Sequence, residues 1–67
     1  MKIKELGAIQ TKNMVESNMF DLIIDLREDD LFEKWHIDKS MNIPMRKIND
    51  NILFLSTYIN KNILLYC

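Results

Sequence analysis

The sequence predicts an α/β domain with a mainly parallel sheet, and its apolar pattern indicates this class. Short apolar runs alternate with helical stretches along the chain. Apolar runs of this length favour buried parallel strands over helices. Strands that alternate with helices indicate a parallel sheet with right-handed crossovers. The 67 residues can form at most one domain, and so small a domain buries only about 60% of the surface that its unfolded chain exposes.

The expected strands follow from short apolar or alternating segments. Residues 1–6 alternate weakly and are expected to form a short edge strand, whereas residues 21–26, DLIIDL, are expected to form a buried strand. Residues 41–43 predict a very short strand that stops at Pro44, because proline has no N–H to donate to a neighbouring strand. Residues 63–66 predict the last strand.

Helices are expected between these strands. The first is residues 12–17, with Thr11 as its N-cap. The second begins at residues 28–30, Glu-Asp-Asp, whose carboxylates suit the positive end of a helix dipole. We expect it to end at His36 and Ile37.

A third helix is expected after Asn49, which is a good N-cap. Ile48, ahead of this cap, is expected to pack on Leu53 as a hydrophobic staple. The apolar stripe of this helix consists of Ile52, Leu55 and Ile59. The complete expected order is strand, helix, strand, helix, short strand, helix, strand.

Composition excludes several classes of function. A net charge of −1 and a pI near 5.7 leave no basic field for nucleic acid or an anionic membrane. One cysteine rules out an internal disulfide framework and a cysteine-based zinc site, and it fits a reducing cytoplasm. The first ten residues lack the apolar core of a secretory signal. One glycine and one proline exclude the Gly-rich phosphate loops of nucleotide-binding motifs. We expect no metal or organic cofactor.

Polar and reactive side chains follow two of the predicted strands. Asp25 and Arg27 lie at the end of one strand, and Cys67 lies at the end of the last. In parallel α/β sheets, ligands bind beyond the carboxyl ends of the strands. We therefore expect these residues to share one crevice. A cysteine without such context is more often an inert buried thiol.

Four segments, IIDLRE, FEKWHI, MNIP and NILLYC, occur in an order that resembles the rhodanese-like domain. That family has a strand ending in Asp-x-Arg, a helix ending in Gly-His-Ile, an Asn-Ile-Pro segment and a strand ending in the catalytic cysteine. The matching positions are Asp25 and Arg27, His36 and Ile37, Asn42 to Pro44, and Cys67. The resemblance implies a rhodanese-like three-layer α/β domain.

The resemblance also implies a sulfurtransferase in which Cys67 is the nucleophile and carries a persulfide. Donors would be thiosulfate or a protein persulfide, and acceptors would be cyanide, a thiol or a sulfur-carrier protein. Asp25, Arg27 and His36 are expected to support the site structurally. Asp25 would bond near the active loop and Arg27 would pair with an acid such as Glu28 or Glu33. His36 would bond the last carbonyls of its helix.

The sequence departs from the family at the bend after the second helix. Trp35 stands where glycine is usual, and Asp38 and Lys39 replace a common Pro-Gly. The family's active-site loop follows the cysteine, so we expect residues 1–67 to be the N-terminal two-thirds of a domain that is incomplete at the C-terminus. Three alternatives remain: a non-catalytic binding or regulatory module, a phosphatase or arsenate reductase of related fold with a longer loop, and a small structural domain with an incidental thiol.

Overall fold

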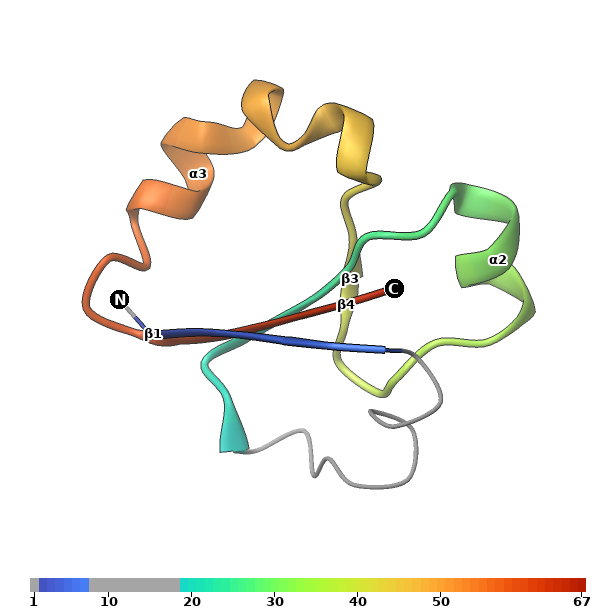
Figure 1. Cartoon of the computed structure of the whole chain (residues 1–67), viewed down its shortest axis with the longest axis horizontal. Helices are drawn as coiled ribbons and strands as arrows, with labels where there is room; N and C mark the ends of the chain where they lie inside the picture. The colour runs from blue at the N-terminus through green and yellow to red at the C-terminus, as the bar shows by residue number, and fades with distance from the viewer. Residues whose placement is uncertain (1, 8–18) are drawn as a thin grey trace.

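The protein forms one four-stranded parallel sheet in the order β1-β4-β2-β3 (Figure 1). The structure is a computed structural model that describes residues 2–7 and 19–67. The strands are β1 Lys2–Leu6, β2 Leu22–Asp25, β3 Met41–Asn42 and β4 Asn62–Tyr66. The predicted α/β class and parallel sheet are confirmed, and β1 is an edge strand as expected. The helix predicted at residues 12–17, with Thr11 as its cap, lies outside the described residues.

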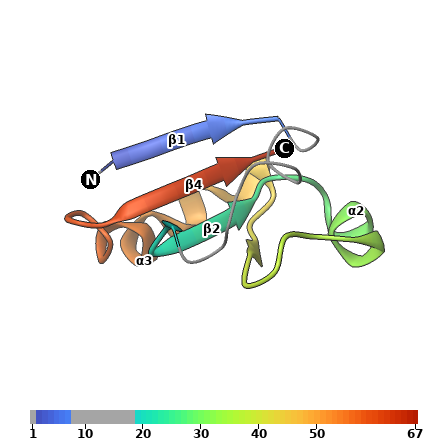
Figure 2. The same ribbon diagram turned by 90° about the horizontal axis from the view of Figure 1, so that it is seen from below.

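The helix α2, Asp29–Lys34, lies beyond the carboxyl end of the sheet (Figures 1 and 2). It begins at the predicted acidic residues but ends before His36 and Ile37, so its predicted end is wrong. The cause is Trp35, whose backbone is extended with φ −168°. In that conformation Trp35 turns its carbonyl and its ring toward Arg27 instead of continuing the helix.

The segment after Pro44 differs most from the sequence expectation. It forms two 3₁₀ turns, η2 Met45–Lys47 and η3 Asn49–Asn51, and then the short helix α3, Ile52–Ser56. Asn49 therefore lies in a 3₁₀ turn and does not cap the helix, and Ile59 lies after its end. None of the helices in the described part of the chain is long and apolar enough to cross a bilayer.

The hydrophobic staple expected between Ile48 and Leu53 is absent from this segment. Because α3 begins three residues later than Asn49, Leu53 points to solvent and is 84% exposed. Ile48 packs instead against the buried core, together with Leu55 and Tyr58.

Two apolar clusters occupy the two faces of the sheet, because successive strand residues point to opposite sides. The face toward α3 holds Leu22, Ile24, Leu26, Ile43 and Ile63. The opposite face holds Ile23, Leu64 and Tyr66, with Phe20 and Ile37 packed against them. Figure 2 shows α3 as a helical layer on one side of the sheet. Full burial of each such aliphatic side chain contributes about 1.5–3 kcal/mol, so both faces stabilise the sheet.

Candidate functional site at the carboxyl edge of the sheet

The strand register brings Asp25, Asn42 and Tyr66 into one row at the carboxyl edge. Asp25 lies beside Asn42 of β3 and beside Tyr66 of β4. The next N–H along β2, that of Leu26, donates to the Tyr66 carbonyl at 2.8 Å. Cys67 follows Tyr66 directly and is exposed. The structure thus places Cys67 at the same edge as Asp25 and Arg27.

Asp25 and Arg27 bind one another at this edge. The Asp25 side chain is fully buried, and Arg27 Nη2 lies 2.8 Å from its Oδ2. Arg27 Nε donates to both carboxylate oxygens at 3.1 Å, and the Arg27 backbone N–H donates to Oδ1 at 2.9 Å. The expected pairing of Arg27 with Glu28 or Glu33 is wrong. Residues two apart in an extended segment lie on the same face, so Asp25 is the nearer acid.

Glu28, one of the acids expected to bind Arg27, has another partner. Its Oε1 accepts a hydrogen bond from Arg46 Nε at 3.1 Å, and both side chains are more than half exposed. Such an exposed ion pair contributes at most about 1 kcal/mol. The buried pair between Asp25 and Arg27 is therefore the dominant ionic contact of this edge.

Arg27 also holds the bend after α2. Its Nη2 donates to the Trp35 carbonyl at 2.7 Å. The guanidinium carbon lies 4.4 Å from the centre of the Trp35 ring and 5.9 Å from that of Tyr66. A planar guanidinium can stack on aromatic rings while its edge donates hydrogen bonds. Arg27 thus joins the end of β2, the bend after α2 and the end of β4.

Charge and burial act in opposite directions on the Asp25 carboxyl. Burial alone would raise the pKa of Asp25, but hydrogen bonds from the side chain and backbone of Arg27 hold this pKa below its ordinary value. Hydrogen bonding to Asp25 in turn raises the pKa of Arg27. Asp25 is therefore a permanently charged anchor at neutral pH and not a proton carrier.

Asn42 fastens the end of β2 from the other side. Its Nδ2 donates to the carbonyl oxygens of Asp25 at 3.1 Å and of Arg27 at 2.8 Å. The sequence indicates Asn42 only as part of the Asn-Ile-Pro segment and predicts no contact for its side chain. Its position directly before Ile43-Pro44, where the strand stops, is a signal that could have indicated such a clamp.

The Tyr66 hydroxyl closes a ring of hydrogen bonds with the bend. The Ile37 N–H donates to it at 3.1 Å, and it lies 3.2 Å from Ser40 Oγ. Ser40 Oγ lies 2.6 Å from the Ile37 carbonyl, which can only accept, so Ser40 donates in this contact. Either hydroxyl can be the donor in the contact between Tyr66 and Ser40. The Asp25 carboxylate is a second acceptor for the Tyr66 hydroxyl. Burial raises the pKa of Tyr66, the hydrogen bonds with Ser40 and the Ile37 N–H offset part of this rise, and the Asp25 carboxylate adds to it.

The same bend contains Lys39, whose φ of 68° lies in the left-handed region. Glycine enters this region without steric cost, whereas a residue with a Cβ does not. Lys39 occupies the place where the rhodanese-like pattern usually has glycine. The bend therefore adopts a left-handed turn at a lysine, beside the contacts of Ile37 and Ser40.

His36 lies outside this network and is exposed. Its Nδ1 is 2.8 Å from the Phe32 carbonyl, and its ring stacks on Phe32 with centroids 3.8 Å apart. Because a carbonyl only accepts, Nδ1 carries the proton in this contact. The predicted bond from His36 to a carbonyl near the end of the helix is confirmed.

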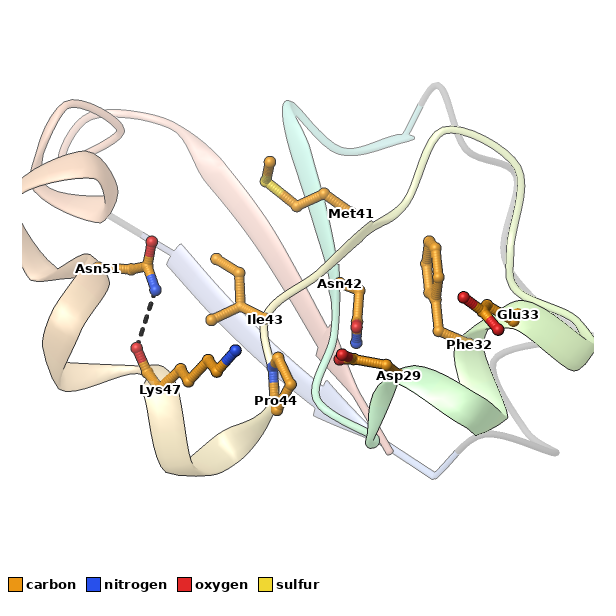
Figure 3. Close-up of a pocket in the computed structure, with 9 residues that line it drawn as sticks. All are labelled: Asp29, Phe32, Glu33, Met41, Asn42, Ile43, Pro44, Lys47 and Asn51. Atoms are coloured by element: carbon orange, nitrogen blue, oxygen red, sulfur yellow. Dashed lines mark hydrogen bonds between the residues drawn. The ribbon is translucent and has the colours of Figure 1, made fainter.

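A cavity of about 530 Å³ lies between α2 and the segment that runs from β3 to η3 (Figure 3). Its walls combine charged and apolar side chains, namely Asp29, Phe32, Glu33, Met41, Asn42, Ile43, Pro44, Lys47 and Asn51. Asp25, Arg27 and Cys67 are not among its lining residues, so this cavity is not the crevice expected from the sequence. Within residues 2–7 and 19–67, no three His, Cys, Asp or Glu side chains are grouped so that they could hold a metal ion.

Comparison with known families adds to this geometry. The family model for the rhodanese-like domain matches residues 7–67. The chain belongs to the rhodanese-like domain family. The match includes β2, β3 and β4 and every residue of the network described above. Comparisons with curated proteins and with solved structures gave no significant match.

Proposed function

We propose that this rhodanese-like domain is a sulfurtransferase in which Cys67 carries sulfane sulfur as a persulfide. The observation that carries the proposal is the exposed Cys67 thiol directly after β4, which β1 and β2 flank. A thiol at the carboxyl edge of a parallel sheet lies where ligands of such sheets bind. Family membership supports the same reaction class.

The proposed reaction has two displacement steps. The Cys67 thiolate attacks the outer sulfur of thiosulfate, a new S–S bond forms, the sulfur–sulfur bond of thiosulfate breaks, and sulfite leaves with the bonding electrons. The outer sulfur of the persulfide is then attacked by cyanide, a thiol or a sulfur-carrier protein. The S–S bond breaks and the Cys67 thiolate returns. A protein persulfide can replace thiosulfate as the donor.

The residues around Cys67 would supply rigidity to this reaction. The thiolate is the reactive form of cysteine, and its displacement reaction depends on access and alignment. Asp25 and Arg27 would keep the ends of β2 and β4 and the bend together, and His36 would stabilise the end of α2. We propose a structural role for all three residues and a cytoplasmic location, where a reducing environment keeps the single thiol free.

Mass spectrometry of the intact protein tests the proposal. Incubation with thiosulfate should add the mass of one sulfur atom, and cyanide should then remove it with formation of thiocyanate. Cys67→Ser should abolish the added mass, whereas Tyr58→Phe, which changes a side chain on the opposite face of the sheet, should still acquire it.

Other outcomes of this experiment would identify the alternatives. Unchanged mass in the wild-type protein would contradict the transferase. Unchanged mass together with hydrolysis of a phosphate monoester or reduction of arsenate would favour the related phosphatase or arsenate reductase chemistry. Unchanged mass without either activity would favour a non-catalytic binding module.

A further inference from the structure

The residue before the proposed nucleophile, Tyr66, is held at more than one point. It is fully buried, and its carbonyl accepts the Leu26 N–H at 2.8 Å. Its hydroxyl accepts from the Ile37 N–H and is hydrogen-bonded to Ser40 Oγ, which in turn donates to the Ile37 carbonyl, so that the three groups form a closed ring of hydrogen bonds. The backbone of Tyr66 is thus tied to β2 and its side chain is tied to the bend after α2.

We propose that Tyr66 is a positioning residue for Cys67, through which the bend at residues 37–40 holds the end of β4. This inference rests on the proposed function for its catalytic consequence. The peptide group that joins Tyr66 to Cys67 moves with Tyr66, so the aim of the thiol depends on the contacts of the tyrosine. The Tyr66 hydroxyl is bound to Ile37 and Ser40, and we assign it no part in the bond changes.

The Tyr66 hydroxyl is a member of a closed ring of hydrogen bonds with Ile37 and Ser40, so it contributes hydrogen bonds as well as packing. The Ile37 N–H donates to the Tyr66 hydroxyl, Ser40 Oγ donates to the Ile37 carbonyl, and the two hydroxyls are hydrogen-bonded to each other, so every member has its partner. Removing the Tyr66 hydroxyl leaves the Ile37 N–H and the Ser40 oxygen without that partner. Buried polar groups that lose a partner are costly, so the bend and the strand end are expected to separate locally.

Tyr66→Phe is the central test, because it removes the hydroxyl and keeps the aromatic ring near Arg27. The first readout is hydrogen exchange at the Leu26 N–H, which reports local opening at the end of β4 without any assumption about function. The second is sulfur transfer from thiosulfate to cyanide. We expect Leu26 exchange to accelerate and kcat to fall by roughly tenfold each, with KM for thiosulfate unchanged, as one lost hydrogen bond at a reacting centre would cause.

Two variants serve as matched controls. Ile63→Val lowers stability from the other end of the same strand without touching the ring, so it should change neither kcat nor the exchange of Leu26 relative to other amides. Tyr58→Phe removes the hydroxyl of a partly buried tyrosine packed against the opposite core, and should likewise leave both quantities unchanged. Ser40→Ala opens the ring at another member and should reproduce the effects of Tyr66→Phe in smaller size.

The outcomes separate the inference from the proposed function. Wild-type protein that gains no sulfur overturns the function, while Leu26 exchange in Tyr66→Phe still decides the positioning role. Leu26 exchange and kcat equal to those of Ile63→Val would overturn the role of Tyr66. A raised KM with unchanged kcat would also overturn it, because the hydroxyl would then act on binding. If Tyr66→Phe fails to fold, the same measurements on Ser40→Ala decide the question.

Discussion

The two faces of the sheet are built on different physical principles. The face toward α3 is held by aliphatic side chains such as Ile24 and Ile63, which pack against Leu55 and its neighbours. The other face, at its carboxyl end, is held by the buried ion pair of Asp25 and Arg27 and by the Tyr66 ring of hydrogen bonds. Apolar packing tolerates changes of shape that keep the volume, whereas a buried polar network requires every partner. The network therefore fixes the backbone geometry directly before Cys67.

The largest expected difference between the faces follows from Arg27→Met. This change leaves the Asp25 carboxylate buried without its cation, and removing one partner of a buried pair costs about 3–5 kcal/mol. Ile24→Val on the apolar face should cost only about 0.5–1.5 kcal/mol. Urea unfolding of both variants measures the two costs, and equal costs would contradict the proposed difference.

The double variant Asp25→Leu with Arg27→Met is the control for this prediction. Because neither charge is then buried, it should be less destabilised than the sum of the two single variants. Additive costs would show that the two side chains act independently of each other.

Acid should weaken the polar face first. Since the pKa of Asp25 is lower in the folded protein than in the unfolded chain, its contribution to stability is complete above the unfolded value of about 3.9 and is lost as pH falls through the folded value. The wild-type protein should lose more unfolding free energy than Asp25→Asn between about pH 5 and pH 2. Urea midpoints across this range measure the difference, and parallel curves would contradict it.

The smallest expected effect is that of His36→Gln. The exposed imidazole contributes one hydrogen bond to Phe32 and one ring stack, so its loss should cost about 0.5–1.5 kcal/mol. Turnover should remain unchanged, because His36 belongs neither to the ion pair nor to the ring around Tyr66. Thermal melts and steady-state rates separate the two effects. A large loss of turnover with an unchanged melt would assign His36 a role in the reaction.

The sequence predicted the strands and the place of Cys67 because both follow from local patterns. The short length of the apolar run at residues 21–26 and of the one ending at Tyr66 favours buried strands over helices. Partner choice could not be predicted in the same way. Arg27 has acids at several spacings, and the extended end of β2 selects Asp25 over Glu28 and Glu33.

Other errors arose where backbone geometry was decided by tertiary contacts. The helix α2, expected to begin at residues 28–30 and to end at His36 and Ile37, ends at Lys34 because Trp35 turns toward Arg27. The segment after Pro44 forms two 3₁₀ turns before α3. The hydrogen bonds of the Tyr66 hydroxyl join it to residues 26 or more positions away, so no local pattern in the sequence indicates them. A buried tyrosine at a strand end, whose hydroxyl needs a partner, was the available signal.

The strand order has a consequence for how the chain acquires its structure. β4 lies between β1 and β2, and Lys2 is paired with Asn62. During synthesis, neither β1 nor β2 can pair with β4 until residues 62–66 have left the ribosome. Such distant contacts slow folding and leave strand edges exposed in the meantime. The nascent chain is therefore expected to need protection from aggregation until residues 62–66 emerge.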